Sequence, residues 1–181
     1  MPSPIRFSHV VLQTNQIGVL RDWYCAMLDG TVVYQNDAIC FITFDEEHHR
    51  IALIDPGGLA HRSGAGSDPL RAGGDTGLHH FAYAFKGLGD LVEVYEGAKA
   101  RSVLPYWCIN HGPTTSMYYR DPDGNRIEMF VDNFPTMREC KAYMEGPAFA
   151  KNPLGVEFDP EKLAARFRAG VPAAELLAIP E

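Results

Sequence analysis

The sequence repeats part of itself, and this repeat limits the folds that the chain can adopt. Residues 9–24 match residues 80–95, with His, Gly, Leu and Tyr recurring at a constant offset of 71. Residues 50–53, Arg-Ile-Ala-Leu, match residues 126–129, Arg-Ile-Glu-Met, at an offset of 76. About five residues therefore entered the second copy between the two matches. The chain is expected to contain two related modules.

Each copy has the pattern of a strand, a helix and three further strands. In the first copy, apolar periodicity predicts a helix that ends at Gly30, and turn residues separate the strands. The predicted elements are a strand over 7–14, a helix from about 18 to 28, and strands around 31–34, 39–44 and 50–55. Two such copies predict an α+β fold, in which two pseudo-symmetric βαβββ modules form a cupped sheet around a cavity and helices cover the outside.

The repeat also predicts how the chain is divided. We expect one domain over residues 1–133, composed of modules at about 5–57 and 77–133. A loop over residues 58–76, rich in Gly, Ser, Asp and Pro, joins the modules. Loops of this length are uncommon as plain connections, so we expect a functional role for it. A helical C-terminal extension over residues 134–181 follows the domain.

The C-terminal extension contains two helix start signals. A capping box at residues 136–139, Thr-Met-Arg-Glu, opens a helix that runs to about Glu145. Residues 159–161, Asp-Pro-Glu, start a second helix that ends at Gly170, and residues 149–158 are expected to be irregular. The extension could form a lid or a contact between subunits, and its apolar side chains suit either role: Leu163, Phe167, Leu176 and Leu177. We expect a homo-oligomer.

Residues 111–132 read as two strands joined by a tight turn, Asp-Pro-Asp-Gly at residues 121–124. Alternation in the second strand places three apolar residues on one face, Ile127, Met129 and Val131, where they are expected to pack against helices. Glu128 then points to the opposite face, into the cavity. An isolated carboxylate would be costly there, and a metal ion would remove that cost.

The repeat aligns further residues with Glu128. His9 and His80 occupy equivalent positions near the starts of the two first strands, and Ala52 is equivalent to Glu128 in the last strands. Two imidazoles and a carboxylate form the facial set that suits non-haem Fe(II), and Mn(II) or Zn(II) also accepts these ligands. For either histidine alone, the alternative is a core residue bonded to a backbone carbonyl. Taken together, His9, His80 and Glu128 predict a metal site inside the cupped sheet.

Composition excludes several other classes of function. The net charge of -7 and the pI near 5.5 argue against a nucleic-acid partner, because no basic stripe is present. No apolar run is long enough to span a bilayer and no signal peptide is visible, so we expect a cytoplasmic protein without a membrane partner. The four cysteines are scattered without a Cys-x-x-Cys pair, which indicates neither a thiolate metal site nor disulfides.

The hairpin resembles a known signature. In order it contains His111, then Met117 and Tyr118, the Asp-Pro-Asp-Gly turn and Glu128. This order resembles the signature of the type I extradiol catechol dioxygenases of the vicinal oxygen chelate superfamily, and the resemblance extends from residue 7 to about 132. It implies metal ligands at His9, His80 and Glu128, and substrate-orienting roles for His111 and Tyr118.

A second match concerns residues 48–53, His-His-Arg-Ile-Ala-Leu. Two-domain members of the family have a similar segment, and its second histidine is their acid and base, which implies this role for His49. Without the resemblance, His48 and His49 beside three acidic residues would predict a solvated hairpin tip. The loop that follows is longer than in those relatives, so His61 is a further candidate to approach the site.

The resemblance implies an extradiol dioxygenase that inserts O2 next to the diol of a catechol-type substrate, with a biaryl diol among the candidates. The C-terminal extension resembles that of small, single-domain members of the 2,3-dihydroxybiphenyl type. One alternative is a glyoxalase-like or epimerase-like lyase or isomerase, whose fourth metal ligand would stand at Ala52. A second is a drug-sequestering protein with a cavity and no metal. Four aromatic residues could line the pocket or belong to the core: Phe85, Tyr106, Trp107 and Phe130.

Overall fold

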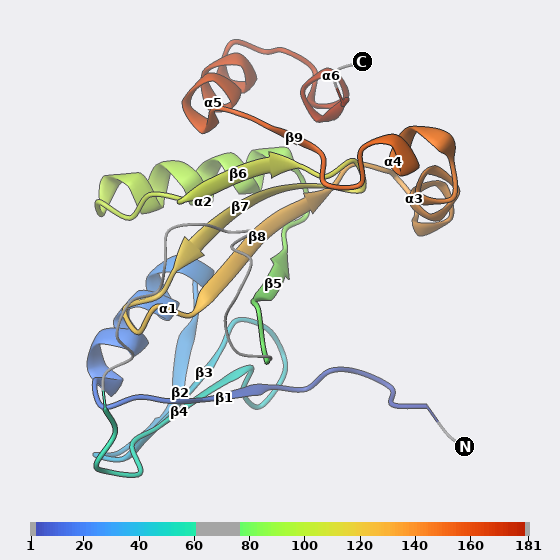
Figure 1. The fold of residues 1–181 in the computed structure, drawn as a ribbon. Helices are drawn as coiled ribbons and strands as arrows, with labels where there is room; N and C mark the ends of the chain where they lie inside the picture. The colour runs from blue at the N-terminus through green and yellow to red at the C-terminus, as the bar shows by residue number, and fades with distance from the viewer. Residues whose placement is uncertain (1–2, 61–76, 180–181) are drawn as a thin grey trace. The chain divides into compact units, whose positions relative to one another are not determined.

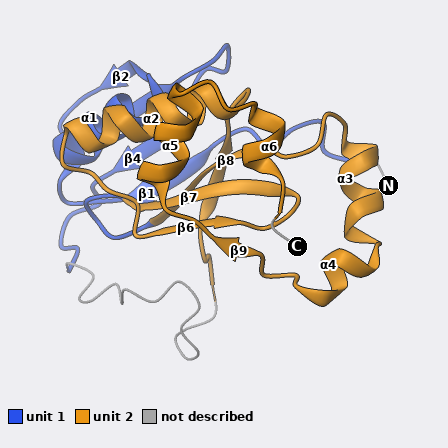
Figure 2. Ribbon diagram, turned by 90° about the horizontal axis from the view of Figure 1, so that it is seen from above, with its two compact units in different colours: residues 1–65, 121–125 blue, residues 66–120, 126–181 orange. Residues whose placement is uncertain are grey.

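The computed structural model describes residues 3–60 and 77–179. The chain divides into two compact units, shown in separate colours in Figure 2. Unit 1 comprises residues 1–65 and 121–125, and unit 2 comprises residues 66–120 and 126–181. The short segment 121–125 is the turn of a hairpin whose strands belong to unit 2.

Unit 1 contains a four-stranded mixed sheet and one helix. Its elements are β1 (Val10–Gln13), α1 (Ile17–Leu28), β2 (Thr31–Gln35), β3 (Ile39–Thr43) and β4 (Ile51–Ile54), and the strand order is β1-β4-β3-β2. β1 runs parallel to β4, and the other pairs are antiparallel. The buried face of α1 follows the helical period, with Ile17, Leu20, Tyr24 and Met27. Asp29, in the left-handed conformation, ends the helix one residue before Gly30.

Unit 2 repeats this arrangement and adds to it. Its first elements are β5 (Phe81–Ala84), α2 (Leu88–Ala100), β6 (Trp107–Asn110), β7 (Thr114–Arg120) and β8 (Arg126–Asp132). They are followed by α3 (Met137–Met144), α4 (Pro147–Lys151), β9 (Val156–Glu157), α5 (Pro160–Arg168) and α6 (Ala173–Leu177). The strand order is β5-β8-β7-β6-β9, and β5 runs parallel to β8 (Figure 1).

Strand pairing confirms the predicted equivalence of the two copies. Val11 pairs with Ala52 in the first sheet, and Ala82 pairs with Glu128 in the second, each between parallel strands. The predicted α+β fold with two βαβββ modules and C-terminal helices is therefore confirmed. The first strand is shorter than expected and begins at Val10 rather than at residue 7.

The predicted faces of β8 are also confirmed. Ile127, Met129 and Val131 are almost completely buried, on the face against which α2 packs.

Among the described residues, every helix is too short or too polar to cross a membrane.

The C-terminal extension has more structure than expected. Both predicted helices form, with Thr136 and Asp159 as their side-chain caps. The expectation of an irregular segment over 149–158 is wrong, because α4 runs to Lys151 and β9 pairs with β6 as a fifth strand. A two-residue strand has no periodicity of its own, and only its pairing with a distant strand reveals it.

Helix α5 packs against α2 within the same unit. The Tyr95 hydroxyl donates to Glu161 at 2.5 Å, Lys99 pairs with the same carboxylate, and Arg168 pairs with Glu96. The apolar side chains Leu163 and Leu176 are buried. These two residues are therefore used inside the chain and are not free for a contact between subunits.

The hairpin turn at residues 121–124 is anchored by a buried carboxylate. Gly124 has φ +79° and donates its N–H to the Asp121 carbonyl at 2.9 Å. The Asp121 carboxylate accepts hydrogen bonds from the backbone N–H of Asp123 and Asn125, from the Asn125 side chain, and from the Tyr24 hydroxyl at 2.8 Å. Burial raises the pKa of Asp121, and the hydrogen bonds from Asn125 and Tyr24 oppose that rise.

We expect Tyr24→Phe to destabilise the protein by about 1.5–3 kcal/mol, because a hydrogen bond to a buried charged group is lost. Thermal unfolding measures the change. Tyr119→Phe is the matched control, since Tyr119 is equally buried but its hydroxyl, among the described residues, donates only to the Met117 sulfur at 3.8 Å. Equal losses in the two variants would contradict a special role for the Tyr24–Asp121 bond.

Candidate metal and substrate site

Unit 2 places two predicted ligands in contact. His80 precedes β5, Glu128 lies in the middle of β8, and the His80 Nε2 and Glu128 Oε2 atoms are 3.0 Å apart. Glu128 is only 8% exposed. Burial raises the pKa of Glu128, but hydrogen bonds from His80 and Ser116 outweigh it and lower the pKa overall. The buried carboxylate is therefore held in its charged, metal-binding form.

Two further predicted residues lie beside this pair. Tyr118 stands opposite Glu128 in the β7–β8 register, and its hydroxyl lies 3.0 Å from the His111 Nε2 atom. The rings of Tyr118 and His80 meet edge to face, with centroids 5.4 Å apart. Burial raises the pKa of Tyr118, so its phenol stays protonated and can donate a hydrogen bond. Unit 2 thus brings the side chains of His80, His111, Tyr118 and Glu128 together on one face of its sheet.

Aromatic side chains extend the cluster. Trp107 packs on Tyr118 with ring centroids 4.9 Å apart, and Tyr106 packs against the same group. Phe85, which directly follows β5, and Phe130, in β8, are half-buried, and the Phe85 N–H donates to the Phe130 carbonyl. Tyr106 and Trp107 therefore lie beside the predicted orienting residues.

Tyr106 is unusual because its hydroxyl is buried and has no hydrogen-bond partner in the part of the chain that the structure describes. The Arg120 guanidinium lies over its ring, 4.5 Å from the centroid. An unpaired buried hydroxyl costs about 1–3 kcal/mol. Such a group is suited to meet a polar atom of a ligand.

We expect Tyr106→Phe to stabilise the substrate-free protein by about 1 kcal/mol, because it removes the unpaired hydroxyl and keeps the ring. For a protein of this size the melting temperature should rise by about 2–4 °C. The sign is opposite to that expected for Tyr24→Phe, so the two variants can be compared in one set of melting curves. A lower melting temperature would show that the hydroxyl is hydrogen-bonded.

Unit 1 places His9 beside His49. Their ring centroids are 4.4 Å apart, and His49 stacks on Phe41 at 4.5 Å with an interplanar angle of 12°. The Nδ1 atoms of His48 and His49 are 2.6 Å apart. Burial, followed by the charges of His9 and His48, lowers the pKa of His49. The predicted acid and base is therefore fixed on an aromatic surface next to a predicted ligand, rather than free on a solvated hairpin tip.

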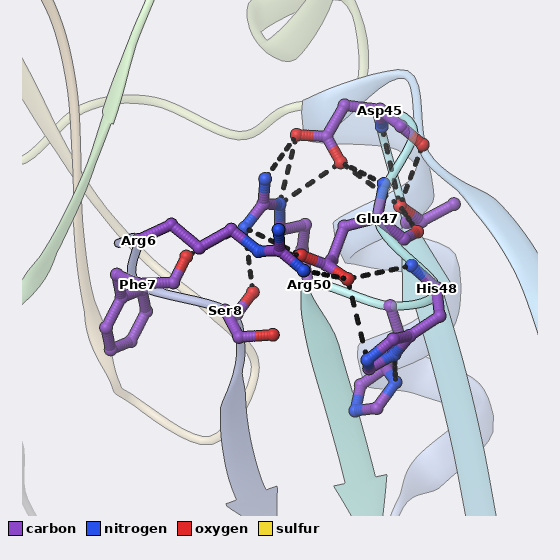
Figure 3. Close-up of polar contacts among 9 residues, drawn as sticks. Arg6, Phe7, Ser8, Asp45, Glu47, His48 and Arg50 are labelled. Carbon is purple, nitrogen blue, oxygen red and sulfur yellow. Dashed lines mark hydrogen bonds and ion pairs between the residues drawn. The ribbon is translucent and has the colours of Figure 1, made fainter. Parts of the chain in front are cut away.

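A network of charged side chains joins the segment before β1 to the hairpin before β4 (Figure 3). Arg50 donates to the carbonyl oxygens of Phe7 at 2.8 Å and Ser8 at 2.9 Å, and its guanidinium also binds Asp45. Arg50 therefore joins the segment before His9 to the hairpin that presents His49. This role of Arg50 could not be predicted from the sequence, although Arg50 directly follows the His-His pair.

Two further histidines are candidate neighbours of the site. His79 lies next to His80, with their Nδ1 atoms 2.7 Å apart. His61 and residues 61–76 of the predicted loop lie outside the described residues. His9 and His49 belong to unit 1, and the other four predicted site residues belong to unit 2. Within either unit, as far as it is described, no three His, Cys, Asp or Glu side chains converge as a metal site, so the three-ligand set stays a prediction.

Residues 6–129 match the Glyoxalase/Bleomycin resistance protein/Dioxygenase superfamily, and the chain belongs to this superfamily. It is 48% identical over 173 residues to biphenyl-2,3-diol 1,2-dioxygenase 2 of Rhodococcus globerulus, covering 95% of this chain and 86% of that protein. It is 44% identical over 171 residues to biphenyl-2,3-diol 1,2-dioxygenase 3 of the same organism, covering 94% and 86%.

Comparison with solved structures supports the fold. Lactoylglutathione lyase from Agrobacterium tumefaciens superposes with a TM-score of 0.55 at 19% identity, covering 72% of this chain and 96% of that one. At this level of identity the likeness shows the fold alone. The family resemblance found in the hairpin signature is confirmed by the superfamily match and by the two relatives.

Proposed function

We propose that the protein is an extradiol dioxygenase that cleaves the ring of a catechol-type substrate beside its diol, with biphenyl-2,3-diol as the first substrate to test. The observation that carries this proposal is the 48% identity to a biphenyl-2,3-diol 1,2-dioxygenase over 95% of the chain. The aromatic surface of Tyr106 and Trp107 beside Tyr118 suits the second ring of a biaryl diol.

We further propose that His9, His80 and Glu128 hold Fe(II), with Mn(II) as the alternative. The donor set fits this group: Glu128 is a buried, charged carboxylate in contact with His80, and a buried carboxylate needs such a partner. Fe(II) held there would supply open coordination positions for the diol and for O2. Ala52, at the position equivalent to Glu128, adds no fourth protein ligand. This favours oxygen chemistry over the lyase and isomerase alternative.

The other site residues act on the substrate. The Nδ1 atom of His49 faces His48, which leaves Nε2 to take the proton of a diol hydroxyl and to return it later. In the substrate-free protein the Tyr118 hydroxyl lies 3.0 Å from the His111 Nε2 atom, which accepts its hydrogen bond and orients it. With substrate bound, the Tyr118 hydroxyl, whose proton burial retains, would turn this proton to a substrate oxygen. Together these groups hold the ring in one orientation for attack next to the diol.

Oxygen uptake tests the proposed function. The protein would be loaded anaerobically with Fe(II) and then given O2 with either 2,3-dihydroxybiphenyl or catechol. We expect equimolar consumption of O2 and diol with a yellow ring-opened product, and faster turnover of the biaryl diol. Metal binding without uptake on either diol would instead indicate a lyase or isomerase. Absence of metal binding would indicate the sequestering protein.

A further inference from the structure

The C-terminal extension contacts a predicted active-site residue directly. The Nδ1 atom of His111 lies 2.6 Å from the backbone carbonyl oxygen of Leu154. A carbonyl oxygen only accepts hydrogen bonds, so Nδ1 must carry a proton. In the neutral ring Nε2 is then the acceptor, and it is Nε2 that faces the Tyr118 hydroxyl at 3.0 Å. A residue outside the hairpin signature therefore sets the tautomer of His111.

The backbone reaches His111 because residue 155 is glycine. Gly155 has φ +104°, and a Cβ atom added to it would lie 2.0 Å from the Asn110 carbonyl oxygen and 2.6 Å from the His111 Cα. Both neighbours are backbone atoms, which cannot rotate away. The Asn152 side chain closes the turn by donating to the Gly155 carbonyl at 2.8 Å and accepting from its N–H at 3.0 Å.

Strand β9 holds this turn against the sheet. Glu157 pairs with Ile109 and Val156 with Asn110, and the Glu157 carboxylate accepts from the Trp107 indole at 2.7 Å. A second contact comes from α6, where the Leu177 carbonyl accepts from the Asn110 side chain at 2.8 Å. The extension therefore holds the end of β6 through two contacts, one from β9 and one from α6. His111 directly follows this end of β6.

We propose that the Leu154 carbonyl is a positioning group for His111, and that Gly155 is the residue that permits its approach. The extension would then be a structural part of the substrate site, beyond any role as a lid. The importance of His111 for turnover rests on the proposed function. The tautomer of His111 does not depend on that function, so the tautomer and the turnover can be tested separately.

The test compares Gly155→Ala with Gly170→Ala in the full chain. Both glycines have a positive φ, +104° and +86°, so alanine is strained at both. A Cβ at Gly170 would meet nothing within 4 Å, so this variant controls for strain without the clash. Asn152→Ala loosens the turn without adding an atom and serves if Gly155→Ala does not fold.

The readout is the ¹⁵N NMR spectrum of the histidine side chains at about pH 8, above the usual histidine pKa of about 6.5. The His111 signals are identified by their loss in His111→Gln. We expect a protonated Nδ1 in the wild type and in Gly170→Ala, and a shift towards the other tautomer in Gly155→Ala and Asn152→Ala. On 2,3-dihydroxybiphenyl, kcat/KM should fall by about 100-fold in Gly155→Ala through misplacement of the ring.

Some outcomes would overturn the proposal. One is a wild-type His111 protonated on Nε2. Another is an unchanged Nδ1 tautomer in folded Gly155→Ala, or in Asn152→Ala if the former does not fold. Inactivity of the wild type on both diols would overturn the proposed function instead, and it would leave the NMR result as the test of the positioning contact.

Discussion

Glu128→Gln should lose bound Fe(II) and ring-cleaving activity together. Changing a partner of a metal ligand costs about 10–100-fold in metal affinity or activity, so replacing a ligand should cost more than about 100-fold. Glutamine has the same shape, can still bond with Ser116 and stays opposite Tyr118 in the β7–β8 register. The fold should therefore survive, and the loss can be assigned to the carboxylate. Iron content and O2 uptake on the same sample measure both effects.

The matched control for this variant is Glu157→Gln. It removes one negative charge from the same sheet as Glu128→Gln does. Glu157 lies on β9, where its carboxylate accepts a hydrogen bond from the Trp107 indole, and it is not a predicted metal ligand. We expect its iron content to equal that of the wild type. A Glu128→Gln protein that retains iron would contradict the assignment of Glu128 as a ligand.

His49→Ala should lower kcat by about 10²–10⁴-fold, the usual contribution of general acid and base catalysis, and should retain iron. The reason is that the His49 ring stacks on Phe41 and lies beside His9, and its Nδ1 atom faces His48, so the proposed proton transfer falls to Nε2. Steady-state turnover on 2,3-dihydroxybiphenyl, normalised to iron content, measures the effect.

His48→Gln is the control for His49→Ala. The His48 side chain is 64% exposed, and glutamine keeps a hydrogen-bonding group beside His49. Its turnover should stay within a few-fold of the wild type. Wild-type turnover in His49→Ala would exclude the acid and base role and would direct attention to another histidine.

The sequence predicted those parts of the fold that depend on local pattern and on the repeat. The two offsets made Ala52 and Glu128 equivalent, and the parallel pairings Val11–Ala52 and Ala82–Glu128 confirm this. The alternation of residues in β8 correctly predicted its buried face. Successive side chains of a strand point to opposite faces, so Ile127, Met129 and Val131 can only be buried together on one of them. Helix caps at Thr136 and Asp159 were also correct, since capping depends on residues only two or three positions apart.

Contacts between distant residues could not be predicted in this way. The Leu154 carbonyl contributes no side chain, so nothing in the residue itself indicates that it binds His111. The Tyr24–Asp121 bond joins residues 97 positions apart, and the repeat does not predict this partner, because Tyr95, the counterpart of Tyr24, bonds Glu161 in the C-terminal extension. Gly155 resembles any loop glycine until the backbone beside it is known. These three contacts depend on which strands pair in which register and on how closely two backbones approach. Neither can be read from the residues near each position in the sequence.

Labelling with ¹⁸O2 tests the proposed extradiol cleavage most directly. The Fe(II)-loaded protein would turn over 2,3-dihydroxybiphenyl under ¹⁸O2, and mass spectrometry would locate the label in the product. Insertion of O2 next to the diol predicts a ring-opened product that keeps ¹⁸O in its new carboxylate. An unlabelled product, or a quinone formed by loss of two hydrogens from the diol, would contradict extradiol cleavage.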